Sequence, residues 1–168
     1  MQYVPGEEEM NKVIILGIDP GKTTGYAIVE YPKQKLLEWG AFNPNKVGET
    51  FVLTDAIEKY QPEVIAIEQP FSKINISSFG KLSKVIGIIE HLYLAYIPNG
   101  HIILTSIRRA NTLMGIKGKP KVNDKANAIA TIFGRDYAKD GFLTDDMASA
   151  VVATMVAWES YQYVKKGM

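Results

Sequence analysis

The stretch from Val13 to Glu30, VIILGIDPGKTTGYAIVE, decides the fold. Val13 to Ile18 is a continuous apolar run typical of a buried strand, and Gly25 to Glu30 is a second run rich in β-forming residues. The Pro20-Gly21 step between them favours a tight connection, so the two runs are predicted to pair as an antiparallel hairpin. Asp19 stands where the first strand gives way to the turn, and this position needs an explanation.

The rest of the chain alternates between extended and helical patterns. Three further strands are predicted, over Leu36 to Phe42, Val64 to Ile67 and Ile102 to Thr105. Four helices are predicted, over Gly48 to Tyr60, Ser77 to Tyr96, Asp124 to Phe133 and Asp145 to Tyr163. Met114 to Val122 is rich in glycine, proline and lysine and is predicted to be a loop. Antiparallel strands followed by alternating helices and short buried strands predict a mixed α/β sheet flanked by helices.

Length and composition bound the class of protein. A chain of 168 residues predicts one domain, which we place over residues 13–164 after a loose, polar lead-in over residues 1–12. The chain contains no cysteine, which excludes disulfides, thiolate zinc sites and cysteine nucleophiles. No apolar run is long enough to cross a membrane, and the N-terminus lacks the pattern of a signal peptide. We therefore expect a soluble, cytoplasmic protein without membrane contact.

Charge is distributed unevenly along the chain although the formal net charge is only +1. Residues 1–71 contain six basic and eleven acidic residues, whereas residues 72–125 contain nine basic and two acidic ones. This separation is typical of an acidic site approached over a basic surface, which suits an anionic polymer. The alternative is that the acidic and basic segments form two ordinary solvent-exposed faces without a binding role, which would give the same counts.

Acidic residues stand at the ends of several predicted elements. Asp19 ends the first strand, Glu68 follows the run VIAI, and Asp145 and Asp146 open the last helix. Neighbouring strands would bring Asp19 and Glu68 to one edge of the sheet, and a helix packed over that edge would add an aspartate. Carboxylate oxygens are hard ligands suited to Mg²⁺ or Mn²⁺. Each residue taken singly has another interpretation: a turn residue, a solvated acid, or an acid at the positive end of a helix dipole.

Three segments resemble the motifs of the RuvC family of Holliday-junction resolvases. These segments are ILGIDPGKTTGYAIV in the hairpin, AIEQPF at Ala66 to Phe71, and DDMASAVVA at Asp145 to Ala153. The resemblance extends in order from about Val13 to Trp158; the first two motifs are specific and the third is looser. It implies an RNase H-like fold, in which a five-stranded mixed sheet with its first three strands antiparallel is flanked by helices.

The resemblance also implies a metal site. Asp19 and Glu68 match family metal ligands, and Asp146 aligns with the first aspartate of the third motif. Asp145 is then the fourth acid or a group that supports the ligands, because adjacent helical residues point about 100° apart. Ser149 stands where the family usually has a second aspartate, which leaves the last ligand position open. Two Mg²⁺ ions are expected, with Mn²⁺ able to substitute.

Basic and aromatic residues complete the predicted site. Lys119 or Lys121 lies where the family places a basic residue near the scissile phosphate, and we assign that role to Lys121. Phe71 matches a family residue that wedges into the junction, although it would equally fill the core beneath its loop. The predicted DNA-binding residues are Phe71, Lys73, Lys81, Lys84, Arg108, Arg109, Lys117, Lys119, Lys121 and Lys125.

The predicted helix from Ser77 to Tyr96 carries apolar residues on more than one face. Ile76, Phe79, Ile88 and Leu94 fall outside its main apolar stripe. Excess apolar surface favours a partner, and the equivalent helix in the resembling family helps to form a two-fold dimer, so a homodimer is expected. Burial within one domain is the alternative.

These features together predict a Mg²⁺-dependent endodeoxyribonuclease that resolves four-way DNA junctions by paired symmetric incisions. One alternative is a nuclease of the same fold that acts on other branched DNA or on precursor RNA. A second alternative is a junction-binding protein that does not cut. The glycine turn GKTTG also resembles the turns that hold nucleotide phosphates in sugar kinases and actin-like ATPases. Those proteins need a duplicated domain that 168 residues cannot supply, so no nucleotide cofactor is expected.

Overall fold

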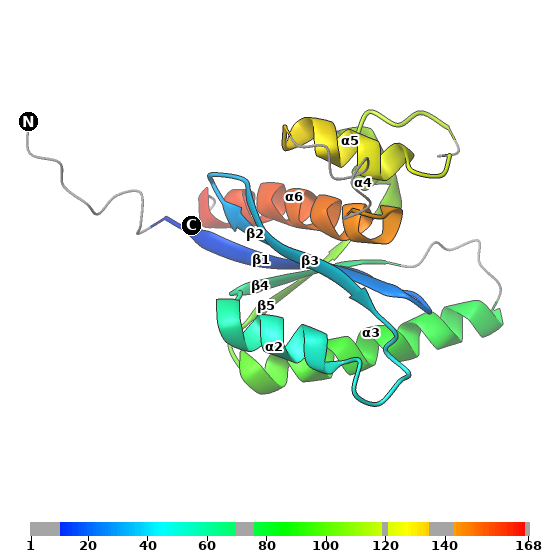
Figure 1. Cartoon of the computed structure of the whole chain (residues 1–168). Helices are drawn as coiled ribbons and strands as arrows, with labels where there is room; N and C mark the ends of the chain where they lie inside the picture. The colour runs from blue at the N-terminus through cyan, green and yellow to red at the C-terminus, as the bar shows by residue number, and fades with distance from the viewer. Residues whose placement is uncertain (1–10, 70–75, 119–120, 135–142, 167–168) are drawn as a thin grey trace, which may run out of the picture.

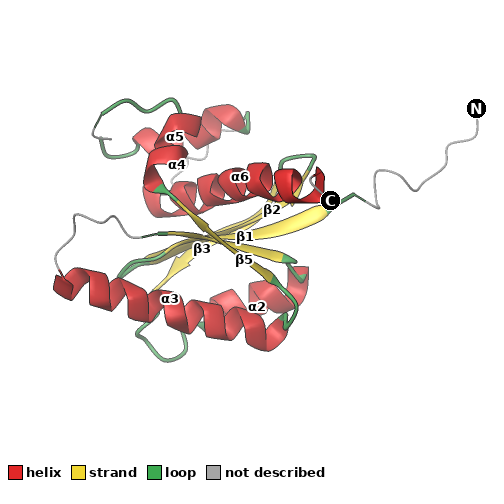
Figure 2. Ribbon diagram, turned by 180° about the vertical axis from the view of Figure 1, so that it is seen from behind, coloured by secondary structure: helices red, strands yellow, loops and turns green. Residues whose placement is uncertain are grey.

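A single five-stranded sheet lies between two layers of helices (Figure 1). The structure is a computed structural model that describes residues 11–69, 76–118, 121–134 and 143–166. The strands are β1 (Val13–Asp19), β2 (Thr24–Tyr31), β3 (Lys35–Phe42), β4 (Val64–Glu68) and β5 (His101–Thr105). The helices are α2 (Phe51–Tyr60), α3 (Ile76–Tyr96), α4 (Ile107–Leu113), α5 (Asp124–Ile132) and α6 (Asp145–Lys166). Helix α6 covers one face of the sheet and carries α4 and α5 on its outer side, and α2 and α3 cover the other face (Figure 2).

The strands are arranged in the order β3-β2-β1-β4-β5. β2 pairs antiparallel with both β1 and β3, whereas β4 pairs parallel with β1 and β5 pairs parallel with β4. This topology confirms the predicted mixed sheet with its first three strands antiparallel. β1 lies at the centre, and its continuous apolar sequence follows from burial on both faces.

Alternation along the central strands divides the core into two clusters. Val13 and Ile15 of β1 belong to the cluster beneath α6, whereas Leu16 and Ile18 belong to the cluster against α2 and α3. Strand side chains alternate between faces, so position 19 at the end of β1 shares the α6 face with Val13 and Ile15. The same alternation governs the site described below.

Two glycines bring α6 directly onto the sheet. A Cβ atom at Gly17 would overlap the backbone carbonyl of Ala150 and lie 2.7 Å from Cγ2 of Thr154. A Cβ atom at Gly25 would overlap the backbone carbonyl of Asp146. Because backbone cannot rotate away as a flexible side chain can, both positions need glycine. The glycines of the hairpin motif therefore set the distance between α6 and the strands.

Helix α4 was not among the predicted helices. Arg108 and Arg109, which follow the predicted strand from Ile102 to Thr105, belong to α4, and this helix begins after Ser106. The hydroxyl of Ser106 accepts a hydrogen bond from the amide of Arg109 at 3.1 Å and caps the helix. The helix has only seven residues with one of them buried, Ala110, so it is too short for the spacing of its apolar residues to identify it from the sequence. None of the described helices is long and apolar enough to cross a membrane.

Candidate active site

Two carboxylates lie side by side at the carboxyl edge of the sheet. Ile18 of β1 pairs in parallel register with Ile67 of β4, so the next residues, Asp19 and Glu68, end neighbouring strands. Strands in a sheet lie about 4.8 Å apart, which makes these two side chains neighbours. Glu68 follows Ala66 on the α6 face and is only 6% exposed. Both acids therefore point from the central strands toward the beginning of α6.

Asp146 joins this pair from the first turn of α6. Its backbone packs on Gly25, and Gly25 pairs with Asp19 in the β1–β2 ladder. The start of α6 is thus fixed above the end of β1, on the opposite side of Asp19 from Glu68. Thr144 precedes the helix, and its backbone carbonyl accepts the amide of Ala148 at 2.8 Å. The structure brings Asp19, Glu68 and Asp146 together as an acid cluster, a name kept below for these three residues.

The acid cluster carries more negative charge than its surroundings offset. Burial raises the pKa of Asp19 above its usual range, and the charges of Glu68 and Asp146 raise it further. Burial also raises the pKa of Glu68, and burial followed by the charge of Asp145 raises the pKa of Asp146. Lys125 lowers the pKa of all three carboxyl groups but does not cancel these effects. Buried carboxylates that repel each other form a site suited to a bound cation.

The residues present fit a hard divalent cation. Three carboxylates supply the oxygen donors that Mg²⁺ prefers. Thr105 of β5 is paired in register with Glu68, and its buried hydroxyl has no hydrogen-bond partner within the described part of the chain. In that same part, no three acidic, histidine or cysteine side chains are arranged so that together they could hold one metal ion. The fit to a cation therefore rests on the chemistry of the three carboxylates and on their common place at the sheet edge.

Lys125 is the basic residue that acts on the pKa of all three carboxyl groups, whereas the predicted Lys121 is not among the causes of those shifts. The Nζ atom of Lys125 donates a hydrogen bond to Oγ of Ser149 at 3.1 Å, next to the acid cluster. The side chain of Lys121 is exposed, and its backbone amide donates to Oδ2 of Asp124 at 2.7 Å. Sequence reasoning counted Lys125 only among the DNA contacts. Its spacing of four residues from the buried Ile129 would have placed it on the inner face of α5.

Asp145 points away from the acid cluster toward α5. Its Oδ2 accepts a hydrogen bond from the amide of Asn123 at 2.8 Å, and its Oδ1 accepts one from the amide of Ala126 at 3.1 Å. Both carboxylate oxygens are therefore engaged with the start of α5. The geometry favours the interpretation of Asp145 as a supporting group over that of a fourth metal ligand.

The predicted DNA-binding residues are distributed over several surfaces. Phe71, Lys73 and Lys119 lie outside the described residues. Lys81 and Lys84 are exposed on the first half of α3, Arg108 is exposed on α4, and Lys117 is exposed in the α4–α5 connection.

Arg109 is held away from the acid cluster. It forms an ion pair with Glu159 of α6, with Nη2 and Oε2 2.6 Å apart. Glu159 follows Asp146 by thirteen residues, so the pair lies about 20 Å farther along the helix. The structure therefore does not bring Arg109 to the candidate site.

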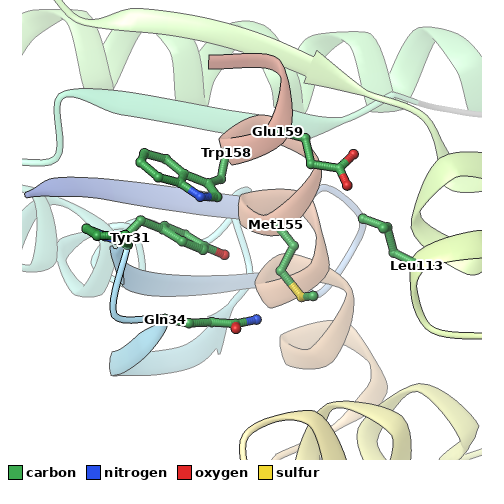
Figure 3. Close-up of a pocket in the computed structure, with 7 residues that line it drawn as sticks. Tyr31, Gln34, Leu113, Met155, Trp158 and Glu159 are labelled. Carbon is green, nitrogen blue, oxygen red and sulfur yellow. The ribbon is translucent and has the colours of Figure 1, made fainter. Parts of the chain in front are cut away.

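A cavity of about 190 Å³ lies in the same distal region (Figure 3). Trp158 and Met155 project from α6 toward Tyr31, and the rings of Trp158 and Tyr31 stack with their centroids 5.1 Å apart. The residues that line the cavity are Tyr31, Pro32, Gln34, Leu113, Met155, Trp158 and Glu159. None of these is an acid-cluster residue, so the cavity and the acid cluster are separate features.

Comparison with known proteins identifies relatives over most of this fold. The family model described as "Crossover junction endodeoxyribonuclease RuvC" matches residues 15–101. The protein of that name from Christiangramia forsetii is 34% identical over 150 residues, which cover 82% of this chain and 77% of the relative. The one from Alkaliphilus metalliredigens is 36% identical over 87 residues, or 45% of this chain, and this match spans about half (53%) of the relative's length.

A solved structure shares the fold. "T. thermophilus RuvC in complex with Holliday junction substrate" superposes with a TM-score of 0.68 at 15% identity, covering 92% of this chain and 97% of the solved one. This similarity confirms the RNase H-like fold that the sequence motifs implied.

Proposed function

Because this chain belongs to the RuvC family of crossover junction endodeoxyribonucleases, we propose that it is a metal-dependent, structure-specific endonuclease that resolves four-way DNA junctions by paired symmetric cuts. The observation that carries the proposal is the acid cluster, in which three carboxylates from β1, β4 and α6 gather at one sheet edge. The solved neighbour bound to a Holliday junction supports the choice of substrate.

Asp19, Glu68 and Asp146 would hold two Mg²⁺ ions. When bound, such ions activate a water for attack on the phosphodiester and stabilise the leaving oxygen. The carboxylates orient the site from rigid strand and helix ends, so little rearrangement of backbone is needed. Lys125, held at the edge of the acid cluster, offsets negative charge that develops on the phosphate.

The basic surface would bind the arms of the junction through their phosphates. Lys81, Lys84, Arg108, Lys117 and Lys121 are all exposed, so their charges are free to replace counterions on DNA. Such contacts position the duplex without reading its sequence. Junction affinity is therefore expected to fall steeply as salt rises.

Two copies of the chain would act together through α3. Only Val85, Ile89 and Tyr93 of this 21-residue helix are buried. Ile76, Phe79 and Leu94 are 92%, 49% and 38% exposed. Helical spacing places Ile76 and Leu94 on one side of the helix and Phe79 between that side and the buried one. We call these three residues the α3 stripe. Burying it against a second copy would give the two-fold arrangement that paired symmetric cuts require.

The experiment compares matched substrates with labelled arms: a four-way junction, a flap and an RNA hairpin, each in Mg²⁺. We expect paired cuts in the junction and little cutting of the others. Asp19→Asn and Glu68→Gln are expected to bind the junction without cutting it. Asp55→Asn, an exposed acid of α2 on the opposite face, serves as the control and should cut normally. A junction that is bound but uncut in both Mg²⁺ and Mn²⁺ would contradict the proposal, and preferred cutting of the flap or RNA would redirect it to that substrate.

A further inference from the structure

Asp145 and Ser149 both contact the start of α5, although neither belongs to the acid cluster. They are four residues apart on α6 and therefore lie on the same face of the helix. The carboxylate of Asp145 accepts hydrogen bonds from the amides of Asn123 and Ala126, which lie on either side of Lys125 in the sequence. The hydroxyl of Ser149 accepts a hydrogen bond from the ammonium group of Lys125 itself. One face of α6 thus contacts the side chain of Lys125 and the backbone amides of two residues close to it.

We propose that Asp145 and Ser149 are positioning residues that together aim Lys125 at the acid cluster, Asp145 by fixing the start of α5 and Ser149 by accepting the ammonium hydrogen bond. This inference rests on the proposed function for its catalytic consequence. It assigns different roles to the two aspartates at the start of α6: Asp146 faces the sheet and belongs to the acid cluster, whereas Asp145 faces α5 and fixes its start.

The local structure explains why such positioning is needed. Asn123, which precedes α5, has a left-handed backbone (φ 70°) and makes no side-chain cap. The amide of Asp124 donates to the carbonyl of Lys121, whereas the amides of Asn123 and Ala126 donate to Asp145, so Asp145 helps to fix the start of the helix. α5 packs on α6 rather than on the sheet, and Figure 1 shows it as the outer layer of that face. A lysine side chain on such a helix has several rotatable bonds, and without a fixed acceptor it would sample solvent.

The chemistry of Ser149 suits this role. The residue is only 1% exposed, so its hydroxyl has little access to water as an alternative partner. A hydroxyl holds the ammonium group without neutralising it, which leaves the positive charge of Lys125 available to a phosphate. A carboxylate in place of the Ser149 hydroxyl would add negative charge to a site that already holds three carboxylates.

The first measurement needs no activity. The metal-free protein is labelled with ¹⁵N-lysine, and the ammonium resonance of Lys125 is assigned by its disappearance in Lys125→Met. We expect a signal protected from solvent exchange in the native protein, its loss in Ser149→Ala, and its retention in Ser160→Ala. Ser160 is the matched control because its hydroxyl donates a hydrogen bond to the carbonyl of Val156 within its own helix, at 3.3 Å. A Lys125 signal unchanged by Ser149→Ala would overturn the role of Ser149.

Spectra of uniformly ¹⁵N-labelled, metal-free protein test Asp145. Asp145→Ala should accelerate amide exchange at Asn123 and Ala126, and Asp145→Asn should do so less because one acceptor oxygen remains. If both amides stay protected in Asp145→Ala, the assigned role of Asp145 is wrong. Thermal melts of every variant establish that the comparison is made between folded proteins.

The second measurement is a double-mutant cycle on single-turnover junction cleavage. Lys125→Met is expected to lower the rate about 100-fold, and Ser149→Ala about tenfold. If Ser149 acts through Lys125, adding Ser149→Ala to Lys125→Met changes the rate by less than about twofold. If the fold-reductions in cleavage rate caused by Ser149→Ala and Lys125→Met instead multiply in the double variant, the positioning role of Ser149 is overturned. A native protein that leaves the junction uncut would instead refute the proposed function, and the resonance experiment would still decide whether Lys125 is held.

Discussion

Gly25 of β2 lies against the backbone carbonyl of Asp146, with no room between them for a Cβ atom. The residue that pairs with Gly25 across the hairpin is Asp19. One glycine therefore fixes the position of an α6 acid relative to a β1 acid. This relationship explains why the hairpin motif needs a glycine after its turn as well as an aspartate before it.

Gly25→Ala is accordingly expected to displace the start of α6 and to reduce junction cleavage. The added methyl group meets backbone, so relief requires movement of the helix, at a cost of about 1–3 kcal/mol in the free energy of unfolding. Urea denaturation and single-turnover cleavage measure the two effects. Gly80→Ala in α3 is the control, since a Cβ atom there has nothing within 4 Å and should leave stability equal or higher. Native stability in Gly25→Ala would contradict the close approach.

The stability of the metal-free protein should fall as pH rises through the neutral range. Burial raises the pKa values of Asp19 and Glu68 in the folded state, so the folded chain binds more protons than the unfolded chain above the ordinary carboxylate range. Stability is then fully present below the unfolded pKa and is lost as pH rises through the folded pKa. Asp19→Asn removes one of these groups. It should stabilise the protein by at least about 1 kcal/mol at high pH and flatten the dependence.

Thermal melts from pH 5 to pH 9 in the presence of a chelator measure this dependence. Asp55→Asn provides a matched removal of an exposed carboxylate and should leave the native slope unchanged. A native protein that becomes more stable between pH 6 and pH 9 would show that the acids are not held in a repulsive, buried cluster.

Addition of Mg²⁺ should reverse this instability. A cation that binds only the folded state stabilises it in proportion to the logarithm of its concentration, and a gain of 1 kcal/mol raises the melting temperature by roughly 2–4 °C in a chain of this size. The shift should be largest at high pH, where the carboxylates are ionised, and it should be lost in Glu68→Gln. Calorimetry of thermal unfolding over a series of Mg²⁺ concentrations measures it. An equal shift in Glu68→Gln would indicate that Mg²⁺ binds elsewhere.

Much of the fold and two of the acids could be predicted because they depend on local pattern. The apolar run of β1 and its glycine turn locate Asp19, and the short apolar run of β4 locates Glu68. Their convergence requires only that β1 and β4 be neighbours in the sheet. Asp145 and Asp146 are different: both open the same helix, and only the alignment of the third motif with the family favoured Asp146 as the ligand. That alignment left the role of Asp145 open, and the contact of Asp145 with α5 is a tertiary feature that no sequence pattern reports.

The basic residues were harder to assign for a related reason. The connection between α4 and α5 contains several lysines, and its length does not show which one returns to the acid cluster. Lys125 does so because α5 packs on α6 through Ala126, Ile129 and Ala130, which carries the first turn of α5 toward Ser149. Helix α4 was missed because seven residues are too few for a periodic spacing of apolar residues to be recognised in the sequence. Tertiary packing, rather than local propensity, decides both features.

The α3 stripe predicts a dimer that can be dissociated by charge. Phe79→Glu and Leu94→Glu place carboxylates on exposed apolar positions, so each should shift sedimentation toward the monomer without lowering the melting temperature. Val47→Glu changes another fully exposed apolar residue, far from α3 in sequence, and should leave the mass unchanged. A native protein that sediments as a monomer at concentrations well above those used for cleavage would contradict the dimer.

Lys125 and Lys121 should differ in the step that they affect. Lys125 lies beside the acid cluster and is held by Ser149, so Lys125→Met should lower the single-turnover cleavage rate about 100-fold while junction affinity changes little. Lys121 is exposed, so Lys121→Met should weaken junction binding, reduce its salt dependence and leave the rate at saturation unchanged. Rates at saturating protein and binding titrations at several salt concentrations separate the two effects. If Lys121→Met lowers the saturated rate as strongly as Lys125→Met does, then the cation nearest the reacting phosphate comes from the loop, and the original assignment from sequence was right.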